Sequence, residues 1–199
     1  MSFQRASLRR GAPPYDAVLL AGGQARRMGG VDKPLLNVGG RTLLERTAEA
    51  VGDAEHLVVV GPPRLALPAA RVVRESPPGA GPVAALGAGL AHVTGVWVAV
   101  LAADLPFLSA DAVRALRVHA GQGDGAVLVD GEGDEQWLVG VWRTVSLRRA
   151  LQGYTGTSMR GLLGPMRPAR VSAAGQRSRP PPWLDCDTME DIANAREWM

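Results

Sequence analysis

The residues best suited to chemistry lie near the start of the chain. An apolar run, Val18–Ala21, opens into a loop, residues 22–33, that holds four glycines together with Arg26, Arg27 and Lys33. Glycines let a backbone approach a ligand closely, and guanidinium and ammonium groups donate hydrogen bonds to anionic oxygens. A buried strand that opens into such a loop predicts a polyphosphate site. The alternative is a flexible surface loop whose cations serve solubility.

Carboxylates at two other places suit a divalent cation. Asp104 follows the most hydrophobic run of the chain, Val96–Ala103, and precedes a Leu-Pro pair. Mg²⁺ usually takes one or two carboxylates plus substrate phosphates, so Asp104 is a candidate ligand. Asp185 and Asp187 alternate in an extended segment and would point the same way, so one of them can complete the site. The alternatives are a turn aspartate at 104 and a helix cap at 187 or 188.

Two further loops are candidates for substrate contacts. Residues 75–82 can wrap a base or ribose, with Glu75 accepting hydrogen bonds from a guanine edge; the alternative is a plain strand-to-helix connection. Residues 156–160 can offer donors to a second anionic substrate, or form a capped helix start. No Ser/His/Asp triad is readable. The expected chemistry is phosphoryl or nucleotidyl transfer, which depends on positioning and charge neutralisation more than on a side-chain nucleophile.

Composition narrows the class of protein. The 199 residues are 46% hydrophobic and 21% charged, which suits one domain with a real core. Only 5% are aromatic and the arginines are scattered, so we expect no nucleic-acid partner. The single cysteine, Cys186, is expected to be packed rather than nucleophilic. Without a secretion signal or an apolar run long enough to span a membrane, we expect a cytoplasmic protein with no membrane partner.

Elements of strand and helix type alternate over the first two thirds of the chain. The expected strands are Val18–Ala21, Leu57–Val60, Val72–Val73, Val96–Ala103, Ala126–Val129 and Leu138–Trp142. The expected helices cover residues 42–51, 82–93, 109–119, 145–152, 157–163 and 188–198. This order predicts an α/β fold with a mainly parallel sheet, helices on both faces and a late antiparallel addition. Ligands of such sheets bind outside the carboxyl ends of the strands, which would bring the glycine-rich loop and Asp104 together.

The expected domain organisation is simple. Residues 1–14 form a flexible basic tail, and residues 15–199 form one nucleotidyltransferase domain. Residues 175–182, rich in Arg, Ser and Pro, are expected to form a mobile loop.

Several blocks of the sequence resemble a known family. Leu-Ala-Gly-Gly at 20–23, Arg-Met-Gly-Gly at 27–30 and Asp-Lys-Pro-Leu-Leu at 32–36 are similar, in residues and spacing, to the signature of molybdenum cofactor guanylyltransferases and their relatives. Further matches lie at residues 39–44, 81–82, 103–106 and 187–191. The resemblance runs from about residue 16 to the C-terminus. Its first block is more specific for the nucleotidyltransferase superfamily than for the molybdenum branch.

The resemblance implies a Rossmann-like three-layer α/β/α sandwich with a mainly parallel mixed sheet. It implies an Mg²⁺-dependent reaction in which GTP and Mo-molybdopterin give the guanine dinucleotide cofactor and pyrophosphate. Transient contact with molybdenum-insertion or acceptor proteins is a further expectation. The implied nucleotide-binding residues are Leu20, Ala21, Gly22, Gly23, Lys33, Glu75 and Asp104. The implied catalytic residues are Arg27, Lys33 and Asp104, and the implied metal ligands are Asp104 and Asp187.

Departures from the family pattern leave alternatives open. Gly-Pro-Pro at 61–63 stands where the family often has an asparagine, and Gln136-Trp137 replaces a typical His-Pro. Asp185 and Asp187 replace asparagines, as in relatives that transfer cytidylyl groups. A CTP-using enzyme, or one acting on another phosphorylated acceptor, is therefore the first alternative. A non-catalytic nucleotide-binding module is the second.

Overall fold

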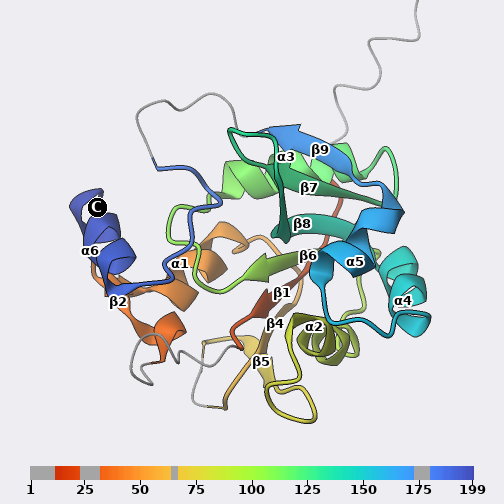
Figure 1. Ribbon diagram of the computed structural model, residues 1–199, viewed down its shortest axis with the longest axis horizontal. Coiled ribbons are helices and arrows are strands. Elements are labelled where there is room, and N and C mark those ends of the chain that lie inside the picture. The colour runs from red at the N-terminus through yellow and green to blue at the C-terminus, as the bar shows by residue number, and fades with distance from the viewer. Residues whose placement is uncertain (1–11, 23–31, 64–66, 173–179) are drawn as a thin grey trace, which may run out of the picture.

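A seven-stranded sheet forms the middle layer of the protein (Figure 1). The structure, a computed structural model, describes residues 12–22, 32–63, 67–172 and 180–199. The strands are β1 (Asp16–Leu20), β4 (Leu57–Val60), β5 (Ala70–Val73), β6 (Trp97–Ala102), β7 (Gly125–Val129), β8 (Glu135–Arg143) and β9 (Ala169–Ser172). Their spatial order is β5-β4-β1-β6-β8-β7-β9. Strand β8 runs antiparallel to both neighbours, and the other pairs are parallel, so the predicted mainly parallel mixed sheet is confirmed.

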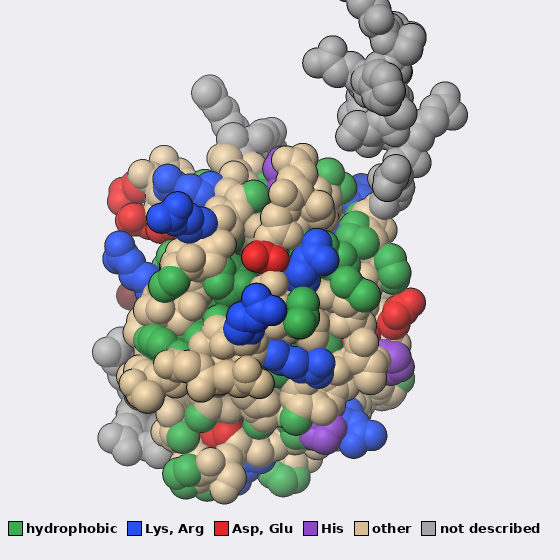
Figure 2. Space-filling view, turned by 90° about the vertical axis from the view of Figure 1, so that its right-hand side faces the viewer, with side chains coloured by type: hydrophobic (Ala, Val, Ile, Leu, Met, Phe, Trp, Pro, Cys, Tyr) green, Lys and Arg blue, Asp and Glu red, His purple; other side chains and the backbone are tan. Residues whose placement is uncertain are grey.

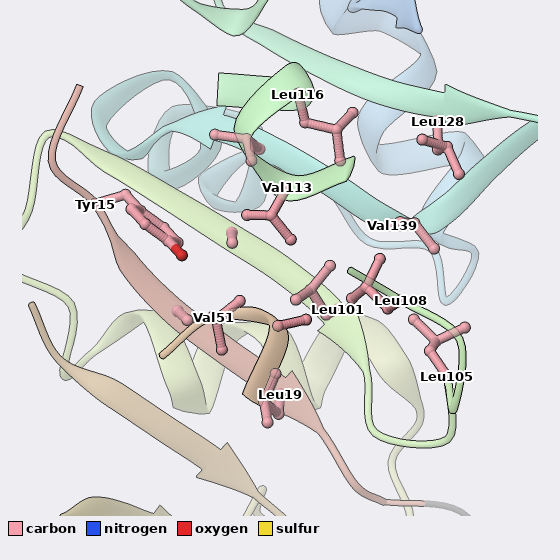
Figure 3. Packing of buried hydrophobic residues seen from close by; sticks show 14 of the residues in the cluster. Tyr15, Leu19, Val51, Leu101, Leu105, Leu108, Val113, Leu116, Leu128 and Val139 are labelled. Atoms are coloured by element: carbon pink, nitrogen blue, oxygen red, sulfur yellow. The ribbon is translucent and has the colours of Figure 1, made fainter. Parts of the chain in front are cut away.

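The central strands are hydrophobic on both sides because both faces of the sheet are covered. All five residues of β1 are buried, and alternate side chains enter different clusters. Ala17 and Leu19 join the cluster on one face, and Val18 and Leu20 join the cluster on the other. Figure 3 shows the first cluster, in which Leu19 packs near side chains from the neighbouring strand and helices.

Helices on each face complete the two outer layers. Helices α1 (Leu43–Ala50) and α3 (Ala110–Ala120) bury residues in the first cluster. Helices α2 (Pro82–Leu90), α4 (Thr144–Gln152) and α5 (Met159–Leu163) bury residues in the second. The predicted three layers are confirmed.

Helix starts follow the sequence signals closely. The Thr42 side chain accepts from the amide of Glu45, whose carboxylate accepts from the Thr42 amide, so the expected capping box is present. Ser109 caps α3 as expected. Helix α5 starts at Met159 behind its Ser158 cap, two residues later than the expected range, because Ser158 supplies the capping oxygen.

Short elements escaped the sequence analysis. They are the 3-10 turns η3 (Lys33–Leu35) and η4 (Gly164–Met166), the hairpin of β2 (Asn37–Val38) and β3 (Arg41–Thr42), and strand β9. Strand β8 also begins three residues earlier than expected. A bulge explains that difference: Val127 lies opposite Gly140, whereas Leu128 lies opposite Gln136. The bulge breaks the two-residue periodicity from which a strand is recognised in a sequence.

A small third cluster joins the C-terminal helix to the hairpin. Helix α6 (Met189–Glu197) buries Ile192 and Ala195, which pack with Val38 of β2 and with Cys186. Burial and the negative charge of nearby aspartates raise the pKa of the Cys186 thiol to about 12. The thiol is therefore protonated at neutral pH, and its predicted packing role is confirmed.

The close approach of α2 to the sheet gives a first prediction. A Cβ at Gly89 would lie 2.6 Å from Val18 Cγ1 and 2.9 Å from Val60 Cγ2. We therefore expect Gly89→Ala to lower the free energy of unfolding by about 1–3 kcal/mol, measured by urea denaturation. Gly87 lies in the same helix with nothing within 4 Å of such a Cβ. Gly87→Ala should leave stability equal or higher, and equal losses in both variants would contradict this account.

On the face shown in Figure 2, Lys and Arg side chains form separate groups with acidic, hydrophobic and other side chains between them. Among the described residues, no helix combines the length and apolar character needed to cross a membrane. Residues 1–11 of the expected tail and 175–179 of the expected mobile loop lie outside the described ranges. The carbonyls of Ala12 and Pro13 accept hydrogen bonds from Arg117. The boundary at residue 14 remains a prediction.

Candidate active site

The site lies at the carboxyl edge of the sheet, where β1 ends between β4 and β6. The amide of Ala21 donates to the carbonyl of Val60, and the amide of Ala103 donates to the carbonyl of Leu20. These bonds fix the backbone that follows β1 beside the end of β6. Leu20 and Ala21 are buried, and Gly22 is exposed where the loop begins. The predicted meeting of this loop start with Asp104 at one edge follows from the register of the strands.

Three charged residues from distant parts of the chain meet at this edge. The Lys33 ammonium forms an ion pair with Asp104, and its Nζ lies 2.5 Å from Oδ1 of Asp187. Lys33 comes from η3, which Pro34 helps to form, while Asp104 follows β6 and Asp187 precedes α6. The side chains of Lys33 and Asp104 are 17% and 19% exposed, and that of Asp187 is 60% exposed. The three predicted residues therefore form one cluster.

The electrostatics of the cluster keep its lysine charged. Desolvation alone would lower the pKa of Lys33, but Asp104 and Asp187 outweigh it, so the pKa lies above its usual value. Desolvation raises the pKa of Asp185, and the negative charges of Asp187 and Asp104 raise it further. The spacing of Asp185 and Asp187 left open which of the two meets the cation, and the family resemblance favoured Asp187. Of these two, Asp187 is the one that pairs with the ammonium among the described contacts.

One carboxylate oxygen in this cluster fits a cation ligand. Oδ1 of Asp104 is buried and has no hydrogen-bond partner within the described residues. In the same part of the chain, no group of three His, Cys, Asp or Glu side chains is arranged to hold a metal. That donor set fits an ion such as Mg²⁺, which takes few protein carboxylates and completes its shell with phosphates and water.

Glu75 forms a second acidic position next to the loop start. It is 7% exposed and follows β5 in the chain. Its Oε1 accepts a 2.7 Å hydrogen bond from the Gly79 amide, while Oε2 is buried and, among the described residues, has no partner. A Cβ built on Gly22 would lie 3.8 Å from Oε1. A free acceptor therefore faces the region beside Gly22, where a donor of a ligand would complete it.

The remaining candidate site residues are of two kinds. Some have a structural role, and others lie outside the residues that the structure describes. Ser158 caps α5, its carbonyl accepts from the Tyr154 hydroxyl, and a Cβ at Gly156 or Gly161 would collide with the Tyr154 ring. This packing favours the capped-helix interpretation of residues 156–160. Gly23, Arg26 and Arg27 lie outside the described residues, so their predicted roles remain predictions.

Sequence reasoning missed what holds Lys33 and Asp187 in place. Leu36 and Phe107 pack against the third cluster, which also contains Cys186. Leu36 lies three residues after Lys33, and Cys186 comes directly before Asp187, so apolar residues close in sequence to both charged side chains take part in this packing. The signal was present in the alternation of Asp185, Cys186 and Asp187, which places a buried residue between two polar ones.

Comparisons with known proteins identify the family of the chain. Residues 17–171 match the model of the MobA-like NTP transferase domain. A molybdenum cofactor guanylyltransferase from Nitrobacter hamburgensis is 36% identical over 201 residues, which cover 92% of this chain and 93% of the relative. A probable molybdenum cofactor guanylyltransferase from Mycobacterium tuberculosis is 37% identical over 142 residues, covering 66% and 69%.

Solved structures give the same fold. A nucleotidyl transferase from Methanothermobacter has a TM-score of 0.77 at 24% identity, covering 92% of this chain and 96% of that one. The molybdopterin-guanine dinucleotide biosynthesis protein A of Archaeoglobus fulgidus has a TM-score of 0.67 at 20% identity, covering 92% and 97%. The expected Rossmann-like α/β fold is confirmed. With the family model spanning most of the chain and a full-length relative above 30% identity, the protein belongs to the MobA-like NTP transferase family.

Proposed function

We propose that this protein transfers GMP from GTP to Mo-molybdopterin, forming the guanine dinucleotide cofactor and releasing pyrophosphate. Its family membership and the names of its relatives support a nucleotidyltransferase of this kind. The observation that carries the proposal is the meeting of Lys33, Asp104 and Asp187 at the edge of the sheet where β1 ends, since the Ala103 amide donates to the carbonyl of Leu20. Cations and carboxylates at the carboxyl edge of a parallel sheet are suited to a triphosphate and its accompanying cation.

Glu75 supports guanine as the base. The Watson–Crick edge of guanine presents N–H donors, and a carboxylate offers only acceptors. Oε2 of Glu75 is buried without a partner among the described residues, and Oε1 is already fixed by Gly79. Cytosine would bring two acceptors and one donor to the same place. A buried acceptor that meets an acceptor is left unsatisfied, so the position favours GTP over CTP.

The site residues have separate roles in the proposed reaction. Asp104, with Asp187, would hold Mg²⁺, and the unpartnered Oδ1 of Asp104 fits that role. Mg²⁺ supplies charge neutralisation of the triphosphate when it is bound. Lys33 would bind phosphate oxygens, and the backbone at Leu20, Ala21 and Gly22 would line the nucleotide.

The proposed chemistry is a single displacement at phosphorus. An oxygen of the molybdopterin phosphate attacks the α-phosphorus of GTP, and the bond to the bridging oxygen breaks. Pyrophosphate leaves with that electron pair. The chain's own residues position the two phosphates and stabilise the developing charge, which requires no side-chain nucleophile. Transient contact with molybdenum-insertion or acceptor proteins remains part of the proposal.

The test compares nucleotides directly. The purified protein is incubated with molybdopterin, Mg²⁺ and each nucleoside triphosphate in turn, and pyrophosphate is measured. We expect the fastest release with GTP, and GTP should also raise the melting temperature most, because binding to the native state alone stabilises it. Faster release with CTP would assign cytidylyl transfer. Nucleotide binding without release from any triphosphate would favour the non-catalytic alternative.

Glu75→Gln gives a prediction specific to the base. The amide keeps the side-chain size and can still accept from Gly79, but its NH₂ group cannot accept from guanine. We expect kcat/KM for GTP to fall about ten- to a hundredfold, because a hydrogen bond to a charged group is lost, while any residual rate with CTP is unchanged. Glu55, exposed and ahead of β4, offers the control. Glu55→Gln should leave both rates unchanged, and an equal fall for GTP and CTP in Glu75→Gln would remove the base-reading role.

A further inference from the structure

Lys33 differs from every other cationic side chain in the protein. It is the only lysine of the chain, which contains 21 arginines. Its ammonium is paired with Asp104 and Asp187 at once. Those two carboxylates are the groups best placed to receive a divalent cation, and the lysine already occupies the position between them. The site thus contains an internal cation before any ligand binds.

The negative charges around the ammonium make it unfavourable to leave this position without a cation. Asp104 and Asp187 both contact the ammonium directly, so removing it would leave two carboxylates close together without a cation. Lys33 and Asp104 are mostly buried, so water screens these charges poorly. A divalent cation that arrives alone must either displace the ammonium, leaving it without a counter-ion, or bind next to a like charge. A nucleoside triphosphate changes this balance, because its phosphate oxygens can receive the ammonium as it leaves the carboxylates.

We propose that Lys33 is an exchangeable counter-ion, which blocks the divalent-cation position and moves from Asp104 and Asp187 to phosphate oxygens when a nucleoside triphosphate binds. Cation binding then depends on triphosphate binding, and the protein does not hold a divalent cation tightly without nucleotide. The identity of the triphosphate rests on the proposed function, whereas the blocking of the cation position does not.

The choice of lysine at this one position agrees with an exchange of partners. An ammonium is a compact charge with three donors on a flexible stem, so it can turn from one set of oxygens to another. A guanidinium would form fixed, fork-shaped pairs with the carboxylates and would be slower to leave them. Arg117, by comparison, uses several donors of its guanidinium at once, on the carboxylate of Asp53 and on the backbone carbonyl of Pro13.

The first test measures Mn²⁺ binding by electron paramagnetic resonance, without nucleotide. Lys33→Met removes the charge while keeping an unbranched side chain of similar length. We expect this variant to bind Mn²⁺ at least about tenfold more tightly than the wild-type protein, a coupling of ordinary size between two ligands. The same variant should bind the GTP–Mg²⁺ complex more weakly. Mn²⁺ affinity equal to or below that of the wild type would overturn the proposal.

A matched control distinguishes the effect of the charge at residue 33 from the effect of the protein's net charge. Arg114 pairs with Asp111 on the exposed surface of α3. Arg114→Met changes the net charge by the same amount and should leave Mn²⁺ affinity unchanged. Lys33→Arg, which keeps the charge in place, should not bind Mn²⁺ more tightly than the wild type. Tighter binding in either variant would attribute the effect to something other than the ammonium at residue 33.

A second measurement uses the unmodified protein, so it does not depend on the folding of a variant. Protein labelled with ¹³C at the lysine side chain gives one side-chain signal, because Lys33 is the only lysine. We expect Mg²⁺ alone to leave this signal in place, and GTP with Mg²⁺ to shift it. A full shift with Mg²⁺ alone would contradict the exchange. A shift with CTP but not GTP would support the exchange and reject the proposed base, so the two proposals fail separately.

Discussion

Asp104→Asn should lower kcat/KM for pyrophosphate release about a thousandfold, because several kcal/mol of transition-state stabilisation depend on the cation that this carboxylate would hold. The amide keeps the size of the side chain but loses the negative charge. It also leaves Lys33 with Asp187 as its remaining ion-pair partner among the described contacts. The pyrophosphate assay with GTP, Mg²⁺ and molybdopterin measures the loss.

The control for this substitution is a carboxylate that is also paired with a cationic side chain but lies away from the Lys33 cluster. Asp124 precedes β7 and interacts with Ser146 and Arg143 on the surface. Asp124→Asn should retain full activity. Circular dichroism should show Asp104→Asn folded, because its side chain lies at the edge of the sheet and outside both main apolar clusters. Nearly full activity of Asp104→Asn would show that this carboxylate holds no essential cation.

Asp16→Ala should lower the free energy of unfolding by about 3 kcal/mol. The substitution removes a charged acceptor and leaves the donors that it satisfies buried without a partner. Asp16 is fully buried at the start of β1. Its Oδ2 accepts 2.8 Å hydrogen bonds from the amides of Thr94 and Gly95, and its Oδ1 lies 3.0 Å from the His56 ring. Urea denaturation at neutral pH measures the effect. Asp111→Ala, on an exposed helix face, should change stability by less than about 0.5 kcal/mol.

The contribution of Asp16 should also depend on pH. Desolvation raises its pKa, but the amides of Gly95 and Thr94 and the His56 ring outweigh this effect and hold the pKa below its usual value. A carboxyl with a lower pKa in the folded state stabilises the protein above its unfolded pKa, near about 4. That stabilisation disappears as the pH falls through the folded pKa. The difference between wild type and Asp16→Ala should therefore be constant near neutrality and shrink in acid; a difference that grew in acid would contradict the assignment.

Much of the fold could be predicted because its signals are local. Strand Leu57–Val60 agrees with the structure at both ends. Thr42 with Glu45 marks the start of α1, since a capping box involves only residues within one turn. Pro82 opens α2, because a proline at the first position of a helix gives up no needed donor. Each of these features depends on neighbours in the sequence.

Elements with weak local signals were missed. Strand β9, with sequence Ala-Arg-Val-Ser, contains two polar residues and lies at an edge of the sheet, where it pairs with β7 alone among the described strands. The hairpin of β2 and β3 is too short to show a period. Its stability comes from packing of Val38 under α6, about 150 residues further along the chain, and from Arg196, which donates to the carbonyl of Asn37. Such contacts leave no trace in a local pattern.

The sequence by itself determined which chemical groups are available: glycines and cations follow one buried strand, and a carboxylate follows another. Because parallel strands end at a common edge of the sheet, it also predicted that these groups lie on the same side. Only the tertiary structure decided which groups meet. It placed Glu75 beside Gly22 and paired Lys33 with Asp104 and Asp187. The type of a residue sets what its side chain can bind. The distance between two residues far apart in the chain depends on how the whole core packs, because the hydrophobic effect is non-directional and does not by itself specify which side chains meet.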